Sequence, residues 1–157
     1  MPASYPGSVK SFTTKVDGVD DVQAAHVNDL QLEVEAVETD LLKAPTDYSG
    51  IATIVGWSSF TIKEFRYWKI GKLVFVIFLI DGTSNNAVTT VSLPYASLSA
   101  NVLGVINAVD NGGAAVAGKF QVSASELRLS PTIAGSYASW TASGTKTVRG
   151  QFFYFTS

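Results

Sequence analysis

The apolar residues of the chain change from a helical to a strand-like spacing near residue 45. Five apolar residues before that point are separated alternately by three and four positions: Val27, Leu30, Val34, Val37 and Leu41. This is the a/d repeat of a coiled coil, and the e and g positions beside it are polar. From residue 51 onward, short runs rich in β-branched and aromatic residues alternate with turn residues. The pattern predicts a helix followed by a β domain.

Local signals predict where the helix begins and how it associates. Asp20 is expected to cap the first turn of the helix with its side chain, and Gln23, three residues later, can complete a capping box. The helix is expected to end before Pro45. Branched residues at a and d favour three strands, although Leu30 at a d position is less typical. So short a helix is marginal alone in water. We therefore expect residues 20–44 to form a short trimeric coiled coil; the alternative is a single helix lying across the β domain.

The β domain is expected to span residues 45–157, after an extended arm at residues 1–19. The predicted strands lie near residues 51–55, 60–69, 72–80, 87–93, 102–109, 114–122, 126–130 and 146–155. Turn residues separate them at Gly71 and within residues 81–86, 110–113 and 143–144. Short strands without any helical pattern among them favour an antiparallel β-sandwich of jelly-roll or Greek-key type. The predicted fold class is therefore mainly β with one N-terminal helix.

Two of the predicted strands are apolar on both faces, at residues 73–80 and 152–155. One face of such a strand fills the core, and the other needs a separate cover to avoid aggregation. We predict that neighbouring subunits supply this cover. The core and trimer residues are then Phe75, Phe78, Ile80, Phe152, Phe153 and Phe155. The alternative cover is the loop at residues 131–145.

The composition also favours self-association. Charged residues make up 15% of the chain and hydrophobic residues 46%, which is unusually apolar for a small monomer. No apolar run reaches the roughly 18–20 residues needed to span a bilayer. The N-terminus also lacks the basic and then apolar pattern of a secretory signal. Residues 1–47 carry a net charge of −6, and residues 48–157 carry +4.

The residue types provide little for catalysis or metal binding. The chain has no Cys and one His, His26, which lies at a g position of the helix. The acids of the β domain are Glu64, Asp81, Asp110 and Glu126, and they form no evident pair for glycoside hydrolysis. Calcium binding at residues 81–86 or 110–113 is an alternative, but the spacing matches no defined calcium loop. We expect no enzymatic activity, no cofactor and no metal.

Several short motifs resemble parts of tailed-bacteriophage structural proteins. Residues 5–12, 15–20 and 25–31 are similar to the N-terminal segment that precedes fibre or host-recognition modules in those proteins. Residues 67–76, 81–85 and 92–94 are similar to the β-sandwich heads of phage fibres and receptor-binding proteins. The resemblance implies a homotrimer on the exterior of the capsid or tail. It also implies that the arm attaches to other virion proteins, with Tyr5, Pro6 and Phe12 as docking residues.

An outward-facing head suggests binding of carbohydrate, because aromatic faces stack on sugar rings. The candidate contacts are Tyr95, Tyr137 and Trp140, the last two in a small-residue stretch that is typical of a surface loop. Trp57 and Trp68 are expected to pack in the core or an interface. No cluster of Lys and Arg interleaves with aromatic residues, so nucleic acid is not an expected partner. The predicted function is a virion fibre that adheres to host-surface carbohydrate; the alternative is a capsid-decorating head fibre or an adaptor.

Overall fold

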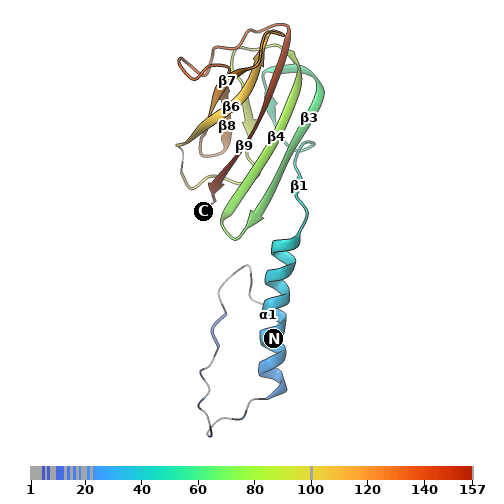
Figure 1. Cartoon of the computed structure of the whole chain (residues 1–157), viewed down its shortest axis with the longest axis vertical. Helices are drawn as coiled ribbons and strands as arrows, with labels where there is room; N and C mark the ends of the chain where they lie inside the picture. The colour runs from blue at the N-terminus through green and yellow to red at the C-terminus, as the bar shows by residue number, and fades with distance from the viewer. Residues whose placement is uncertain are drawn as a thin grey trace. The chain divides into compact units, whose positions relative to one another are not determined.

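The computed structural model describes residues 5, 7, 10–12, 14, 16, 18, 21, 23–99 and 101–156. The chain divides into two compact units, Met1–Ala44 and Pro45–Ser157. The first unit contains the helix α1, and the second contains the strands (Figure 1). The mainly β fold with one N-terminal helix is therefore confirmed.

Helix α1 spans Ala24–Leu42 and begins later than its predicted start at Asp20. Gln23 is the N-cap, and its backbone N–H donates to Nδ1 of His26 at 3.1 Å. In this capping box the His26 imidazole, at the third helical position, takes the role that the sequence predicted for Gln23. Asp20 itself lies outside the described residues. At the other end Lys43 is already extended, two residues before Pro45.

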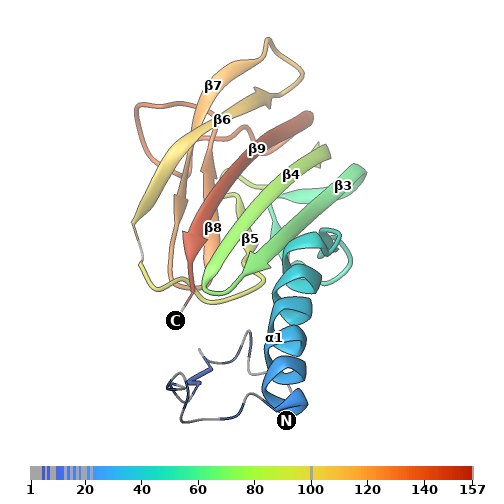
Figure 2. The same ribbon diagram turned by 60° about the horizontal axis from the view of Figure 1, so that its bottom comes forward.

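The second unit is one antiparallel sheet of nine strands. The strands are β1 (Thr46–Asp47), β2 (Ile54–Val55), β3 (Trp57–Ile70), β4 (Leu73–Ser84), β5 (Thr90–Ser92), β6 (Val102–Asp110), β7 (Val116–Val122), β8 (Glu126–Ser130) and β9 (Thr145–Phe155). Their order is β1-β3-β4-β9-β6-β7-β8-β5-β2. The sheet curls, so that β8 and β5 lie behind β9 and β4 (Figure 2). The antiparallel β domain is confirmed, and its finer assignment to a jelly roll or Greek key stays a prediction.

The predicted turn within residues 81–86 begins too early. Asp81 and Gly82 lie inside β4, where they pair with β3 on one side and β9 on the other. Strand β4 therefore continues to Ser84. Hydrogen bonding to two neighbours outweighs the local turn preference of the Asp-Gly pair. The turns at Gly71 and at residues 111–112 do form, with positive φ at Gly71, Asn111 and Gly112.

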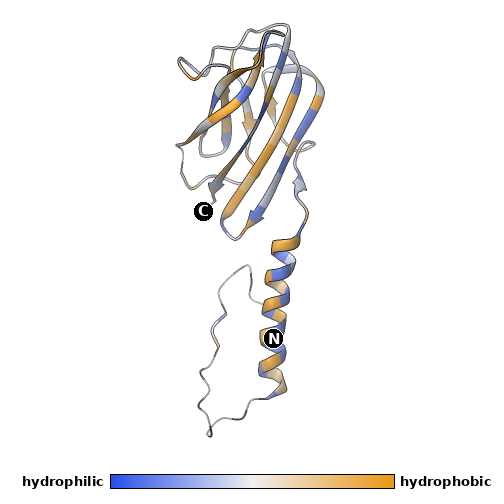
Figure 3. Cartoon of the chain, viewed as in Figure 1, coloured by the Kyte–Doolittle hydropathy of each residue, from blue (hydrophilic) through white to orange (hydrophobic). Residues whose placement is uncertain are grey.

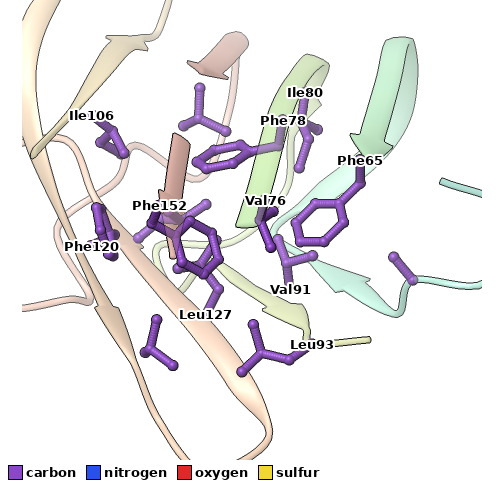
Figure 4. Close-up of a cluster of buried hydrophobic side chains, with 14 of the residues drawn as sticks. Phe65, Val76, Phe78, Ile80, Val91, Leu93, Ile106, Phe120, Leu127 and Phe152 are labelled. Atoms are coloured by element: carbon purple, nitrogen blue, oxygen red, sulfur yellow. The ribbon is translucent and has the colours of Figure 1, made fainter. Parts of the chain in front are cut away.

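The core lies between the two halves of the curled sheet. Strand β4 is apolar along most of its length (Figure 3), but only every second side chain is fully buried. Phe65, Val76, Phe78, Ile80 and Phe152 point into the shared interior (Figure 4). Ring centroids of Phe152 lie 5.1 Å from Phe120 and 6.2 Å from Phe78. This aromatic cluster joins strands from both halves of the sheet.

The β unit has two ends, which we name the entry end and the distal end. At the entry end are the β3–β4 turn at Gly71, residues 93–99 and Phe155. The chain enters here, because Thr46 of β1 pairs with Tyr67 near the end of β3. At the distal end are the loops at residues 85–89, 111–115 and 131–144. The distal loops are therefore the part of this unit farthest along the strands from the point of entry.

Candidate functional site

The face of β3, β4 and β9 that points away from the core carries a band of apolar side chains. Trp68, Phe75 and Phe153 lie opposite one another across the three strands, and Leu73 lies opposite Phe155. Phe153 is 59% exposed and Phe155 is 54% exposed. We call these five residues the outer apolar band. Its residues come from three adjacent paired strands and form one continuous apolar stretch on this face.

The residues predicted for the core or the trimer divide between the two faces of the sheet. Phe78, Ile80 and Phe152 are buried in the core. Phe75, Phe153 and Phe155 belong to the outer apolar band. The alternative in which residues 131–145 cover this face is wrong, because Phe153 and Phe155 stay exposed. That loop instead sends a side chain into the core.

The a/d seam of α1 is also open within its own unit. Val27, Leu30, Val34 and Leu41 are exposed, and Val37 is half-buried. The described arm residues that contact the helix do so beside the seam. Tyr5 donates its hydroxyl to Asp40 at 2.8 Å, and Lys10 lies 3.4 Å from a carboxylate oxygen of Glu33. The described arm residues therefore leave the seam free to contact another helix. Association of copies through the seam stays a prediction.

The docking residues predicted in the arm have different environments. Tyr5 is half-buried against α1, and its hydrogen bond to Asp40 raises the pKa of the phenol. Phe12 is exposed, with the Lys10 ammonium 5.4 Å from the ring centroid. Pro6 lies outside the described residues. A groove of about 490 Å³ lies along the helix beside Tyr5, lined also by Leu32, Glu35, Ala36, Thr39, Asp40 and Lys43.

The three candidate carbohydrate contacts do not form one site. Tyr95 lies at the entry end, partly exposed, with its ring 5.5 Å from that of Tyr67 and 5.3 Å from the Lys69 ammonium. Tyr137 lies in a distal loop, with the Lys119 ammonium 4.8 Å from its ring centroid. The surface position predicted for Trp140 is wrong. This residue is 3% exposed, and its indole N–H donates to the Leu129 carbonyl at 2.9 Å.

A buried lysine at the distal end is the most unusual group of the β unit. The side chain of Lys146 is fully buried, and its ammonium lies 4.9 Å from the Trp57 ring and 5.0 Å from the Trp140 ring. Its Nζ donates to the Gly56 carbonyl, the Asn86 carbonyl and the Thr89 hydroxyl at 2.9–3.0 Å. Burial lowers the pKa of Lys146 to about 8, and the nearby Asp110 carboxylate opposes this shift.

Hydrogen bonds to neighbouring groups fix the position of this lysine. The Trp57 indole N–H donates to the Lys146 carbonyl at 3.1 Å. Asp110 accepts the backbone N–H and the hydroxyl of Thr141, next to Trp140, at 3.1 and 2.9 Å. Lys146 was not predicted as a site residue, although the sequence contains a signal for its burial. Its position is in phase with Val148, Phe152 and Tyr154, which all face the core from β9.

Carboxylates in the segments considered for calcium bind the chain's own groups. The Asp81 carboxylate accepts the Thr147 hydroxyl at 2.5 Å, and Asp110 binds Thr141 as described. Across the part of the chain that the structure describes, no cluster of three or more metal-ligating side chains is found. Among the described residues, no helix is both long and apolar enough to cross a membrane. A shallow hollow of about 230 Å³ lies beside Glu64, Arg66, Ile77, Phe78 and Leu79.

Comparison with known proteins adds no relative. No family model, no curated protein and no solved structure matches the chain. The fold thus defines a class, a mainly β protein with one N-terminal helix, and leaves the resemblance to phage fibres as a prediction.

Proposed function

We propose that the chain is a homotrimeric virion fibre protein whose β domain faces outward and adheres to carbohydrate on a host cell. The observation that carries the proposal is the outer apolar band. A regular sheet face with two half-exposed phenylalanines, Phe153 and Phe155, is a contact surface rather than an ordinary solvated face. The exposed heptad seam of α1 points to the same kind of partner, which is a second copy of the chain.

The area available supports a contact between copies. A covered aromatic side chain buries about 150–250 Å². Phe153 and Phe155 are each just over half exposed, so together they contribute roughly 200 Å² per copy. Trp68, Leu73 and Phe75 extend the band. The seam of the helix adds a separate area, which brings the total toward the roughly 800 Å² per partner of a standard interface.

The polar residues beside the band fit the rim of an interface. The rows of the sheet nearer the distal end carry exposed Glu64 and Arg66 on β3 and Arg149 on β9. Charges of both signs therefore border an uncharged aromatic centre. Stable protein interfaces have this arrangement of an apolar core and a polar rim. The rim also supplies opposite charges with which a second copy can pair.

The first expected result is a trimer that depends on the band. Light scattering of the full chain should give a mass about three times 16.7 kDa, and Phe153→Ser should shift it toward the monomer because a polar residue removes the central contact. Ile133→Ser is the matched control. It replaces another exposed apolar residue, in a distal loop outside the band, and should leave the mass unchanged.

Two outcomes would contradict the oligomer proposal. One is a monomeric mass for the unmodified chain at tens of micromolar. The other is a trimer that Phe153→Ser leaves intact, which would exclude the outer apolar band as the contact. Circular dichroism of each variant checks that its β domain is folded, so that loss of the trimer is not confused with unfolding.

Adhesion to carbohydrate is supported by the distal loops. They lie farthest from the point where the chain enters the β unit, and they present the ring of Tyr137 beside Lys119. The net charge of +4 on residues 48–157 favours anionic polymers of a cell surface. We expect the full chain to bind glycans on an array, and Tyr137→Ala to weaken that binding about tenfold or more. Tyr95→Ala tests the separate candidate contact at the entry end, because Tyr95 does not lie in the distal loops.

A purely structural fibre or adaptor would give a different result. It would bind neither the array nor host cells, while labelled chains would still join virus particles. Deletion of residues 1–19 separates the role of the arm from that of the head. It should leave a folded trimer that no longer joins particles, and continued incorporation would contradict the docking role of Tyr5, Pro6 and Phe12.

A further inference from the structure

At the distal end, the buried amine of Lys146 contacts several segments that are separate in the sequence. Its acceptors are Gly56 before β3 and Asn86 and Thr89 between β4 and β5. Its aromatic neighbours are Trp57 of β3 and Trp140 of the loop at residues 131–144. We propose that Lys146 is a protonation-dependent latch, and that the charge of its amine sets how often this distal loop opens. This inference does not rest on the proposed fibre function.

In the charged state every hydrogen of the ammonium has an acceptor. The distances to the Gly56 carbonyl, the Asn86 carbonyl and the Thr89 hydroxyl are 3.0, 2.9 and 3.0 Å. Two indole faces lie within the range of a cation–π contact. These contacts offset the cost of taking a positive charge out of water without removing it. When Lys146 is charged, the closed state therefore still carries part of the free-energy cost of burying that charge.

In the neutral state the same atoms are satisfied without that penalty. A neutral amine has two hydrogens, which can stay on the Gly56 and Asn86 carbonyls, and one lone pair. The Thr89 hydroxyl can reverse its bond and donate to this lone pair, because a hydroxyl both donates and accepts. The amine and its three hydrogen-bond partners therefore stay hydrogen-bonded to one another in either state. Loss of the proton therefore keeps the closed geometry and removes the buried charge.

The ionisable surroundings of the amine are simple. Asp110 is the charged group that acts on Lys146, and it favours the ammonium. The other groups that contact the amine are neutral: two backbone carbonyls, one hydroxyl and two indoles. The Asp110 carboxylate is itself held in place by the Thr141 hydroxyl, which donates to it at 2.9 Å. The pH response of the latch is therefore due to protonation of Lys146.

The direction of the response follows from linkage. The pKa of Lys146 is about 8 in the closed state, whereas an amine exposed by opening returns to its ordinary pKa of 10.5. Opening therefore takes up a proton between these two values. As the pH rises through this window, opening becomes less favourable and the loop closes more firmly. The open population should fall on the order of tenfold between pH 7 and 9.5.

Hydrogen exchange with mass spectrometry on the full chain tests this inference. Exchange is corrected for its intrinsic dependence on pH, and the protection of residues 131–144 is compared at pH 7 and 9.5. We expect protection of this loop to rise on the order of tenfold, and that of residues 93–99 at the entry end to change little. Protection of the distal loop that stays constant or falls would overturn the proposal.

A variant and a second measurement separate the latch from a merely structural lysine. Lys146→Met keeps the length of the side chain and should remove the rise in protection, whatever the absolute protection of the loop. If this variant does not fold, the pH dependence of protection in the unmodified chain still decides the proposal, and acetylation tests whether the amine is enclosed. Lys146 should react at least a hundredfold more slowly than exposed Lys72 at pH 7. Equal rates would show that the amine is not enclosed and would overturn the proposal.

Discussion

Replacement of Gly82 by alanine should destabilise the β domain by about 3 kcal/mol or more, because it forces two strands apart. Gly82 is buried in β4 and faces the irregular part of β3, where the pairing shifts between Trp57 and Ser59 and between Phe60 and Ile62. A β-carbon at Gly82 would overlap the backbone carbonyl of Ser59 and lie 3.0 Å from the Phe60 Cα. Backbone atoms held in a sheet cannot yield as a flexible side chain does.

Urea unfolding followed by circular dichroism measures this effect. Gly50→Ala is the matched control, because a β-carbon there meets no atom within 4 Å and the backbone has no positive φ. That variant should be neutral, or more stable by up to about 1 kcal/mol, since alanine restricts the unfolded chain. Equal urea midpoints for Gly82→Ala and the unmodified protein would contradict the close approach of β3 and β4.

The strands were predictable wherever alternation along the chain matches burial. The run at residues 126–130 coincides with β8, and the runs at 102–109 and 146–155 differ from β6 and β9 by one residue at an end. The two-residue strand β1 is too short to leave a pattern. Asp81-Gly82 misled the prediction because the pair is a turn signal in isolation. Pairing with strands distant in the sequence decided its conformation.

The distal end was not predictable from local composition. Trp140 lies in a stretch rich in Ser, Ala and Gly, which is typical of a surface loop. Its burial depends on contacts with Leu129 and Lys146, from two other segments of the chain. The pattern of residues within 131–144 does not indicate these contacts with distant segments. The alternation along β9 did place Lys146 on the core face, but a charged residue is normally assigned to solvent.

The two apolar strands gave the most useful prediction. Their sequence indicated that each has a second apolar face, and the structure places Phe153 and Phe155 on such a face. That a second copy of the chain covers this face stays a proposal. The seam of α1 has the same status, since four of its five residues are exposed and its helix begins at Ala24 rather than near Asp20. Both features concern association, which local patterns indicate only indirectly.

Phe152→Ala should remove about 4 kcal/mol from the free energy of unfolding, because it opens a cavity in the centre of the core. The ring of Phe152 has its centroid 6.2 Å from that of Phe78, 5.1 Å from that of Phe120 and 5.9 Å from that of Tyr154. It is 5% exposed, so truncation removes a buried neighbour from each of these rings. Thermal unfolding should show a lower Tm at every protein concentration.

Phe153→Ala is the matched control on the adjacent position of the same strand. Phe153 faces away from the core and is 59% exposed, so its truncation creates no cavity in the β domain. If copies of the chain meet at the outer apolar band, this variant loses the dependence of Tm on protein concentration that association produces. Its Tm should then equal that of the dilute unmodified protein. A concentration-independent loss of stability as large as that of Phe152→Ala would place Phe153 in the core and contradict the division of β9 into two faces.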